Sequence, residues 1–320
     1  MSFLSVRDMS VTIGRVEPLH GVSLSVDQGQ ILGVVGESGS GKSLTAMAIM
    51  GLLPLIGGRV SAGSIMLEGV ELVGMAQEPY RALRGRRMAL ITQNPMTSLD
   101  PLLRVGVQID QVALLHLGLT QAAAKARSID LLQQLRIPDA ATVYDQFPHQ
   151  MSGGMKQRIV IAMALAGDPD LIVADEPTTA LDVTIQAQII QILVELVRER
   201  GLALVLITHD MGVVAQACDQ VTVLYAGRVA ESNSVAQIFA KPQHPYTRAL
   251  IGCIAREGQL PGSLQGIAGI VPSVTDYASG CRFHPRCAMA QASCQTDVPL
   301  LREFSMGKVA CHFAGEAKHV

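Results

Sequence analysis

The sequence predicts an α/β fold with a mostly parallel sheet that is covered by helices. Continuous apolar runs, such as residues 31–35 and 202–207, are typical of strands buried on both faces. Segments with helical spacing of apolar residues, such as 105–137 and 184–200, alternate with these runs. The length of 320 residues suits one large domain of this kind together with an extension.

The first part of the chain reads as β structure that leads into a glycine-rich loop and a helix. Residues 3–6 and 22–26 alternate in polarity, and residues 27–30 read as a hairpin turn before the strand at 31–35. The glycine-rich loop follows this strand directly. A helical stretch at 44–53 comes next.

Three further runs end next to polar residues. A predicted strand at 88–92 ends before Gln93, one at 171–174 ends in Asp175 and Glu176, and the run at 202–207 ends just before Thr208 and His209. The carboxylates after residue 174 are a candidate site, because α/β proteins place their sites at the carboxyl ends of strands. A lone glutamine or histidine after a strand is uninformative by itself. Residues 221–226 and 228–231 read as a hairpin about a glycine, and the pattern breaks after residue 239 in a Pro-rich turn.

Composition excludes some classes of function. Lys and Arg total 25 against 27 for Asp and Glu, and Trp is absent. A chain without a basic excess and with few aromatic residues is not expected to bind nucleic acid. The hydrophobic fraction of 49% fits either a well-buried parallel sheet or a large apolar interface with other subunits.

No membrane span or signal peptide is expected. The apolar stretch 43–58 is shorter than the roughly 20 residues of a span and contains Pro54, and the N-terminus has no basic region before an apolar one. The chain should therefore stay in the cytoplasm. Six cysteines in that compartment indicate free thiols or a metal centre rather than disulfides.

The glycine-rich loop has the pattern GxxxxGK[ST] between a strand and a helix. In such a loop, backbone N–H groups and the helix N-terminus cradle phosphates, the lysine reaches the β- and γ-phosphates, and the hydroxyl at the eighth position can hold Mg²⁺. This predicts binding and hydrolysis of ATP. The predicted nucleotide-binding residues are Gly36, Glu37, Ser38, Gly39, Ser40, Gly41, Lys42 and Ser43.

Two adjacent carboxylates follow the strand at 171–174. Asp175 is placed to bind Mg²⁺, and Glu176 is placed to polarise the attacking water. A third candidate, Ser152, Gly153 and Gly154, lies before a helical stretch at 159–165. It could form another anion-binding nest, although Ser and Gly also suit an ordinary helix cap.

These motifs, in this order, resemble those of the ATP-binding subunits of ABC transporters. The signature, usually written LSGGQ, reads MSGGM at residues 151–155, so its first and fifth positions depart from the family pattern. The resemblance implies that Ser152 to Gly154 contact a γ-phosphate. It also makes Gln93 the Q-loop glutamine near Mg²⁺, Asp182 the aspartate of a D-loop at residues 180–182, and His209 the switch histidine.

One family feature is missing, because no aromatic residue lies at 11–16 to stack on adenine. Adenine is then expected to be packed by Ile13 or Val16. Discrimination between bases should be weak.

The resemblance narrows to the branch of dipeptide, oligopeptide and nickel importers. It rests on residues 94–101, residues 175–189 and residues 244–247 with the Cys-rich tail that follows, and it covers essentially the whole chain. It is strongest to the first ATPase subunit of a peptide permease. It implies an ABC-type P-loop NTPase core at residues 1–240, with an antiparallel β subdomain and a helical signature subdomain at about 95–158. Residues 241–320 form a small Cys-rich C-terminal extension.

Four cysteines crowd into this extension: Cys281, Cys287, Cys294 and Cys311. Their spacing is wider than that of most structural zinc sites, and four thiolates also suit an iron–sulfur cluster. Some members of the branch bind a [4Fe–4S] cluster through this tail, which favours a cluster here, with Arg282 and Arg286 offsetting its charge. Zinc and unliganded thiols remain alternatives.

The resemblance also implies an assembly. A second, related ATPase subunit would pair head to tail with this chain, so that each ATP lies between one phosphate loop and one signature. Two membrane permease subunits would dock near residues 93–101 on the cytoplasmic face of the bacterial inner membrane. An extracytoplasmic binding protein would deliver the substrate.

The expected activity is ATP hydrolysis that powers import of di- and oligopeptides. The same role in a nickel, metallophore or other small-solute importer is an alternative. A soluble ABC ATPase of DNA repair or translation is a third hypothesis, but such proteins usually carry two ATPase cores or a long coiled coil, and this chain has one core and no heptad run.

Overall fold

The computed structural model describes residues 2–179, 181–254, 266–304 and 307–315. The chain divides into two compact units, which are described separately below. The first unit comprises Met1–Asp27, Ile31–Gly74 and Ile207–Val320, and the second comprises Gln28–Gln30 and Met75–Leu206.

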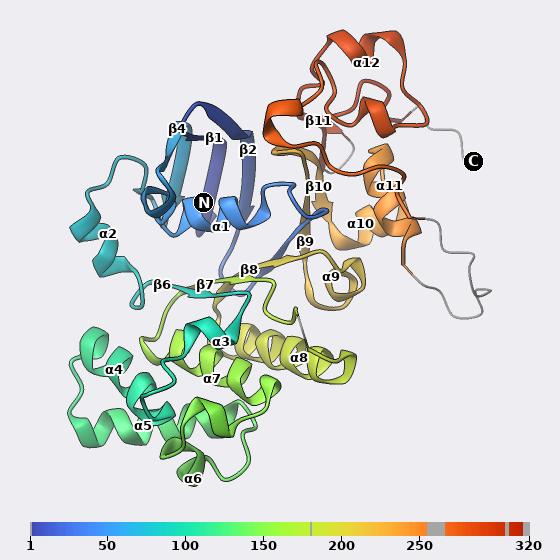
Figure 1. Cartoon of the computed structure of the whole chain (residues 1–320). Coiled ribbons are helices and arrows are strands. Elements are labelled where there is room, and N and C mark those ends of the chain that lie inside the picture. Colours follow the sequence, from blue (N-terminus) through green and yellow to red (C-terminus); the bar gives the residue numbers. More distant parts are fainter. Residues whose placement is uncertain (1, 180, 255–265, 305–306, 316–320) are drawn as a thin grey trace. The chain divides into compact units, whose positions relative to one another are not determined.

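The first unit contains a four-stranded antiparallel sheet with the order β2-β1-β4-β5 (Figure 1). Its buried face carries fully buried apolar residues such as Met9, Val11 and Leu19. The predicted antiparallel β subdomain is therefore present. Its strands are β1 (Leu4–Ile13), β2 (Val16–Val26), β4 (Gly58–Leu67) and β5 (Val70–Glu71).

A second set of strands in the first unit includes the strand that leads into the glycine-rich loop. β3 (Ile31–Val35) is buried at all five positions and pairs in parallel with β9 (Gln220–Tyr225). β9 pairs antiparallel with β10 (Arg228–Ser234), which confirms the hairpin predicted about Gly227. β12 (Gly307–Val309) joins β10, and β11 (Arg302–Phe304) joins β12.

The hairpin turn predicted at residues 27–30 is wrong. β2 pairs with β1, whereas β3 pairs in parallel with β9, so the residues between β2 and β3 connect two different sheets. The first helix is also shorter than predicted, since α1 spans Lys42–Ile49 and Gly51 follows with a φ of 63°. The remaining helices of this unit are η1 (Leu53–Ile56), α9 (Met211–Ala217), α10 (Val235–Ala240), α11 (Pro245–Gly252), η3 (Val274–Asp276), η4 (His284–Arg286) and α12 (Ala292–Thr296).

The C-terminal extension contributes to the core of the first unit. Tyr246 and Phe283 belong to the same buried cluster as Val35 of β3, and Val223 and Tyr225 of β9. The three rings of Tyr225, Tyr246 and Phe283 pack with centroid distances of 4.7, 5.1 and 5.2 Å. The strand before the glycine-rich loop and the extension thus share one hydrophobic core.

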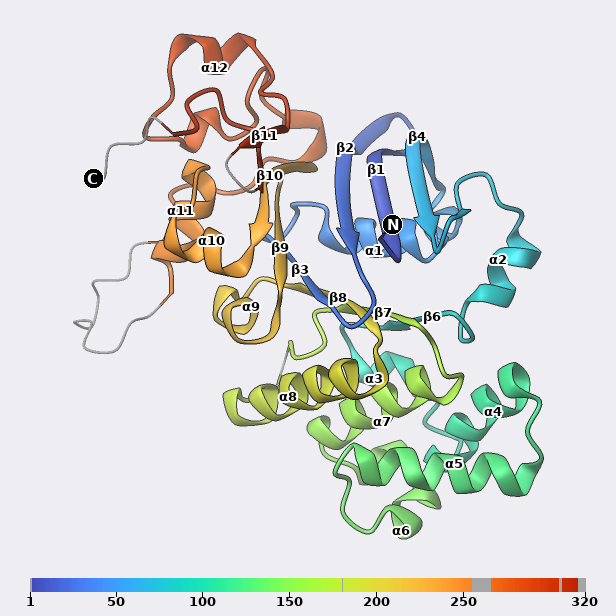
Figure 2. The same ribbon diagram turned by 180° about the vertical axis from the view of Figure 1, so that it is seen from behind.

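The second unit contains a parallel strand pair and a group of helices (Figure 2). β6 (Met88–Ile91) pairs in register with β7 (Leu171–Asp175), so that Ile91 lies opposite Ala174. Helices α4, α5 and α7 contact one another. The helices are α2 (Gln77–Leu83), α3 (Pro95–Ser98), α4 (Val105–Leu117), α5 (Gln121–Gln134), α6 (Ala140–Tyr144), η2 (Pro148–Gln150), α7 (Gly153–Ala166) and α8 (Val183–Arg200).

The helical stretch expected at 105–137 is two helices. Gly118, with a φ of 62°, ends α4, and the Thr120 side chain accepts a hydrogen bond from the backbone N–H of Ala123 to cap α5. A buried aspartate ties the helices together, because Asp110 accepts hydrogen bonds from Ser128 Oγ (2.6 Å) and Tyr144 Oη (2.5 Å).

The α/β class predicted from the sequence is confirmed. The strand β8 (Ala203–Thr208) is buried at all six positions, as its apolar run indicated. Both units combine helices with strands. None of the helices in the described part of the chain combines the length and the apolar character needed to cross a membrane.

Candidate nucleotide site

The glycine-rich loop lies between β3 and α1, as the motif predicts. Gly36 and Gly41 have φ angles of 153° and 103°. A Cβ on Gly36 would lie 2.2 Å from the Leu224 carbonyl oxygen, and one on Gly41 would lie 2.4 Å from a methyl of Leu19. Both positions therefore require glycine, because the loop passes close to its neighbours and Gly41 is in the left-handed region.

Lys42 folds back over the start of the loop. Its side chain is buried, and its Nζ donates hydrogen bonds to the carbonyl oxygens of Gly36 (2.8 Å) and Glu37 (3.1 Å). The backbone N–H of Gly227 donates to the Ser40 carbonyl (2.9 Å) and fixes the other end of the loop. The ammonium group is thereby held at the concave side of a loop that precedes a helix N-terminus, which is an arrangement suited to phosphate.

The polar residues after β6 and β7 meet in the second unit. Because the two strands are parallel and in register, the residues beyond their carboxyl ends lie side by side. Gln93 Nε2 donates a hydrogen bond to Glu176 Oε2 (2.9 Å), and Thr179 Oγ1 donates to the same oxygen (2.8 Å). The Glu176 carboxylate is thus held in one orientation by two donors, and Asp175 directly precedes it at the end of β7.

Glu176 also has an unusual backbone. Its φ of 48° lies in the left-handed region, which is uncommon for a residue with a side chain. Such conformations cost free energy and cluster at functional sites. Six other non-glycine residues in the described part of the chain share this conformation, so the hydrogen bonds of Glu176 carry its assignment.

The signature and the D-loop lie together in the second unit. Ser152 caps α7, since its side chain accepts a hydrogen bond from Met155 N (3.3 Å). A Cβ on Gly154 would lie 2.7 Å from a methyl of Ile185, and one on Gly153 would lie 3.5 Å from a methyl of Leu181. Because the two glycines have no side chains, Leu181 and the start of α8 can pack closely against them. Ser152 and Gly153 are exposed.

The other predicted residues lie on both units. Asp182 caps α8 by accepting a hydrogen bond from Ile185 N (2.9 Å). Ala180, the first D-loop residue, lies outside the described residues. His209 is exposed just after β8, and Ser43 is exposed in the first turn of α1. The half-buried Ile13 and Val16 face each other across the turn between β1 and β2.

The prediction of an iron–sulfur cluster at Cys281, Cys287, Cys294 and Cys311 is wrong. In the part of the chain that the structure describes, which includes all four thiols, no group of three or more His, Cys, Asp or Glu side chains could hold a metal ion. The thiols line a cavity of about 20 Å³, the space of about one water molecule, and its walls are mostly apolar.

Burial also affects the protonation of the thiols. Burial raises the pKa of Cys281 to about 11 and also raises the pKa values of Cys287 and Cys311. Burial disfavours the thiolate, so these thiols stay protonated at neutral pH. All four cysteines are free thiols; Cys294 is buried and the other three are partly buried.

Both arginines assigned to the cluster have other partners. Arg282 donates a hydrogen bond to the Ala226 carbonyl, and its guanidinium lies 4.1 Å from the centroid of the Tyr277 ring. Arg286 forms an ion pair with Glu37 of the glycine-rich loop (2.7 Å). Tyr246 also contacts Glu37. No local pattern in the sequence indicated that Arg286 or Tyr246 belongs to the site.

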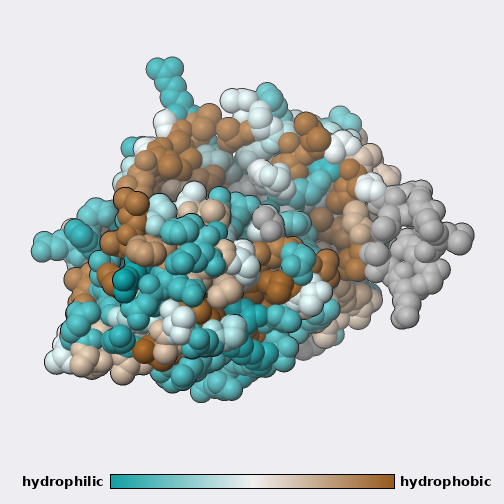
Figure 3. Space-filling view, turned by 60° about the horizontal axis from the view of Figure 1, so that its bottom comes forward, coloured by the Kyte–Doolittle hydropathy of each residue, from teal (hydrophilic) through white to brown (hydrophobic). Residues whose placement is uncertain are grey.

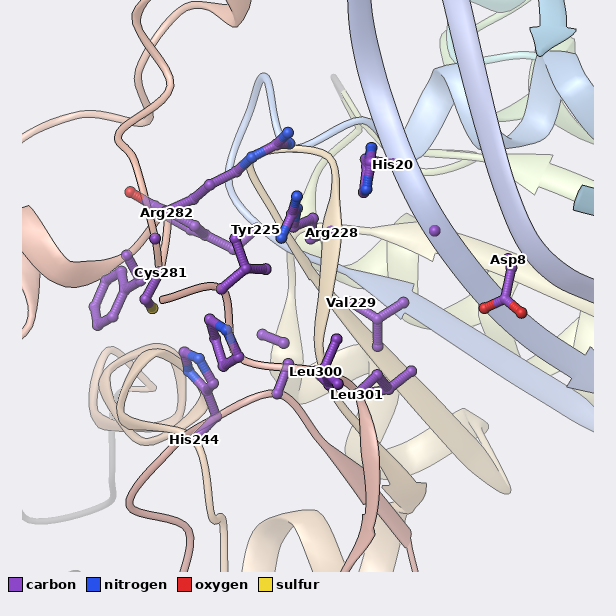
Figure 4. A pocket seen from close by; sticks show the side chains of 17 residues that line it. Asp8, His20, Tyr225, Arg228, Val229, His244, Cys281, Arg282, Leu300 and Leu301 are labelled. Carbon is purple, nitrogen blue, oxygen red and sulfur yellow. The ribbon is translucent and has the colours of Figure 1, made fainter. Parts of the chain in front are cut away.

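A larger cavity of about 360 Å³ lies elsewhere in the first unit (Figure 4). Asp8, Arg228 and Leu300 are among the residues that line it, and they come from the N-terminal sheet, β10 and the C-terminal extension. Cys281 lines its wall, but none of the predicted nucleotide-binding residues does. The predicted nucleotide-binding residues therefore lie outside this cavity.

Comparisons with protein families assign both parts of the chain. Residues 19–179 match the model of the ABC transporter family, and residues 230–294 match that of the oligopeptide/dipeptide transporter C-terminal region. The first match covers the glycine-rich loop, Gln93 and the acidic pair. The second covers the extension as far as Cys294.

Individual relatives agree. The chain is 45% identical to the dipeptide transport ATP-binding protein DppD of Escherichia coli over 98% of this chain and 97% of the relative. It is 41% identical to the oligopeptide transport ATP-binding protein AppD of Bacillus subtilis over 94% and 92%.

Among solved structures, it resembles an ATP-binding subunit of an ABC transporter with a TM-score of 0.62 and 28% identity, over 75% of this chain and 93% of that one. It also resembles a dimeric bacterial ABC transporter cassette with a TM-score of 0.64 and 25% identity, over 72% and 98%. The chain belongs to the ATP-binding proteins of the ABC transporter family, and within them to the dipeptide and oligopeptide transporter type.

Proposed function

We propose that this ATPase powers the import of di- and oligopeptides as the peripheral subunit of a transporter on the cytoplasmic face of a bacterial inner membrane. One observation carries the peptide assignment. Residues 230–294, outside the ATPase motifs, match a C-terminal region of oligopeptide and dipeptide transporters, and relatives named for dipeptide transport align over nearly the whole chain.

The glycine-rich loop from Gly36 to Ser43 is proposed to bind the phosphates of ATP. Lys42 supplies positive charge to the β- and γ-phosphates, and the loop N–H groups and the start of α1 surround them. Ile13 and Val16 form the apolar surface for adenine. Because apolar packing does not read the hydrogen-bonding edge of a base, GTP should compete almost as well as ATP.

Hydrolysis is assigned to the residues that follow β6 and β7 in the second unit. This group, called the acidic edge, comprises Gln93, Asp175, Glu176 and Thr179. Glu176 accepts the proton of the attacking water, and the hydrogen bonds from Gln93 and Thr179 hold its carboxylate in place. Ser43, Asp175 and Gln93 provide the hydroxyl, carboxylate and amide oxygens that suit Mg²⁺, which offsets phosphate charge when bound. His209 and Asp182 complete the proposed catalytic set.

Partners complete the assembly. Ser152, Gly153 and Gly154 are proposed to face the ATP of a second, homologous ATPase subunit, an assignment supported by the exposure of Ser152 and Gly153. Two membrane permease subunits dock beside α3, where Met96 is 61% and Leu102 is 83% exposed. Figure 3 shows hydrophobic areas on one face of the molecule. An extracytoplasmic binding protein delivers the peptide.

Growth tests the proposal. A strain that lacks the gene should fail to grow with dipeptides as its sole nitrogen source and should recover with the wild-type gene. Complementation with Lys42→Ala should not restore growth, whereas growth on ammonium should be equal in all strains. Normal dipeptide-dependent growth of the deletion strain, with uptake of labelled dipeptide unchanged, would contradict the peptide assignment.

A further inference from the structure

Glu37, the second residue of the glycine-rich loop, is held from three sides. Its backbone N–H donates a hydrogen bond to Tyr246 Oη (2.9 Å), and its carbonyl oxygen accepts one from Lys42 Nζ (3.1 Å). Its carboxylate accepts two from Arg286, with distances of 2.7 and 2.9 Å. One loop residue thus connects the proposed phosphate-binding lysine to two residues of the C-terminal extension.

The ion pair between Arg286 and Glu37 is shielded and bidentate. The Arg286 side chain is 7% exposed, and the two parallel hydrogen bonds have the geometry that gives Arg–carboxylate pairs both strength and direction. These hydrogen bonds raise the pKa of Arg286, so the arginine stays charged. Arg286 Nε also donates to the Ala268 carbonyl (2.8 Å), and the guanidinium lies 5.7 Å from the centroid of the Tyr225 ring.

Tyr246 presents its hydroxyl from a rigid position. The residue is fully buried between Tyr225 and Phe283, on helix α11. The cap of this helix is His244, whose Nδ1 accepts the N–H of Tyr246 (3.0 Å). Because the ring is buried between two other rings and its helix is capped by His244, the extension defines the position of the hydroxyl that accepts the Glu37 N–H.

The apex of the loop faces the extension as well. A Cβ on Gly39 would lie 4.0 Å from a methyl of Val271, and no other heavy atom beyond its immediate neighbours lies within that distance. Gly39 also has a φ of 82°. A loop with several glycines in the left-handed region loses much conformational entropy on ordering, so external contacts that fix it are valuable.

Charge gives the contact a second role. Glu37 places a carboxylate within the loop proposed to receive a polyanion, and an uncompensated negative charge there would repel the phosphates. Arg286 neutralises this carboxylate from the side of the extension. The extension therefore contributes both shape and electrostatic balance to the loop.

We propose that Arg286 and Tyr246 are positioning residues of the nucleotide site, through which the C-terminal extension sets the affinity for ATP. This inference rests on the proposed assignment of the Gly36–Ser43 segment as the phosphate loop. Neither residue touches the nucleotide. Both act through Glu37, by holding its backbone and by compensating its charge.

The test is the dissociation constant of ATP in the presence of Mg²⁺, measured on the full chain together with its melting temperature. Arg286→Ala should weaken ATP binding about tenfold, as expected for the loss of a charge-assisted hydrogen-bonded pair. Tyr246→Phe, which removes only the hydroxyl, should weaken it about threefold. Lys308→Ala, which breaks the exposed Lys308–Glu303 ion pair (3.4 Å) in the same extension, is the matched control and should bind ATP as the wild type does.

A double variant separates positioning from general stability. Adding Glu37→Gln to Arg286→Ala removes the unpaired carboxylate and should recover part of the lost affinity, and Arg286→Lys should lose less than Arg286→Ala. If Arg286→Ala does not fold, Tyr246→Phe and Arg286→Lys decide. ATP affinities within twofold of wild type in the folded variants, while Lys42→Ala loses binding, would overturn the inference. Wild-type binding by Lys42→Ala would instead overturn the proposed phosphate loop.

Discussion

The glycine-rich loop and the acidic edge are stabilised in different ways. The loop is fixed at Glu37, whose N–H donates a hydrogen bond to Tyr246 and whose carboxylate accepts hydrogen bonds from Arg286; these residues lie 209 and 249 positions away from Glu37. The acidic edge is fixed by a residue three positions away, Thr179, and by Gln93, which the parallel pairing of β6 and β7 brings alongside. The pairing of the strands thus sets the geometry of the proposed catalytic residues, whereas contacts with the extension set the conformation of the phosphate loop.

Because of this difference, substitutions in the two regions should affect ATP affinity and the rate of ATP hydrolysis separately. Changes at the acidic edge should lower the rate of hydrolysis and leave ATP affinity intact, since Glu176 and its donors act on the water. Changes in the extension should alter affinity first.

The largest effect is expected for Glu176→Gln. Loss of the carboxylate that accepts the water proton should lower kcat by about 10³-fold while ATP binding is retained. The measurement is phosphate release and ATP affinity for the same preparation of the transporter. Glu199→Gln, on the exposed surface of α8, serves as the control. Turnover near that of the wild type would show that Glu176 is not the base.

Acid should destabilise the extension through His244. Burial, with a smaller effect from Arg248, lowers the pKa of His244 from 6.5 to about 4. Between these values the unfolded chain binds a proton that the folded one does not, so stability is full above pH 6.5 and falls as the pH drops toward 4, by about 3 kcal/mol. Denaturant unfolding at pH 7, 5.5 and 4.5 measures this loss.

His244→Asn keeps a side chain that can cap α11 but removes the titrating group. Its unfolding free energy should depend less on pH than that of the wild type. A variant whose pH profile overlays the wild-type profile would place the acid sensitivity at other groups.

A smaller effect is expected for Thr179→Val, which removes one of the two donors to Glu176 Oε2. Misorientation of the carboxylate should lower kcat about tenfold, with the KM for ATP unchanged. Thr184→Val, at an exposed position of α8, should behave like the wild type. An increase in KM without a change in kcat would reverse the division of roles between the two regions.

The sequence predicted the acidic edge well because its signal is local. A buried strand followed by two carboxylates indicated Asp175 and Glu176, whereas Gln93 was predicted from the family resemblance. The parallel pairing of β6 and β7 brings Gln93 and Glu176 into contact. The full lengths of β1 and β2 were missed, because register shifts between Val6 and Met9, and again before Val11, interrupt the alternation.

Other features had no local signal. The ion pair between Arg286 and Glu37 joins residues that are 249 positions apart, and no sequence pattern around either residue indicates it. The number of cysteines and the family resemblance suggested a cluster, but neither reports the volume or polarity of the space between the thiols. Both depend on how the extension packs against the core, which the sequence pattern did not indicate.

Amide hydrogen exchange of residues 36–39 measures directly whether the extension holds the phosphate loop. In the wild type, the Glu37 N–H donates a hydrogen bond to Tyr246 Oη. The Glu37 amide should therefore exchange faster in Tyr246→Phe than in the wild type, while amides at 176–179 in the acidic edge keep their rates. Equal exchange of Glu37 in the two proteins would contradict the claim that the extension holds the phosphate loop.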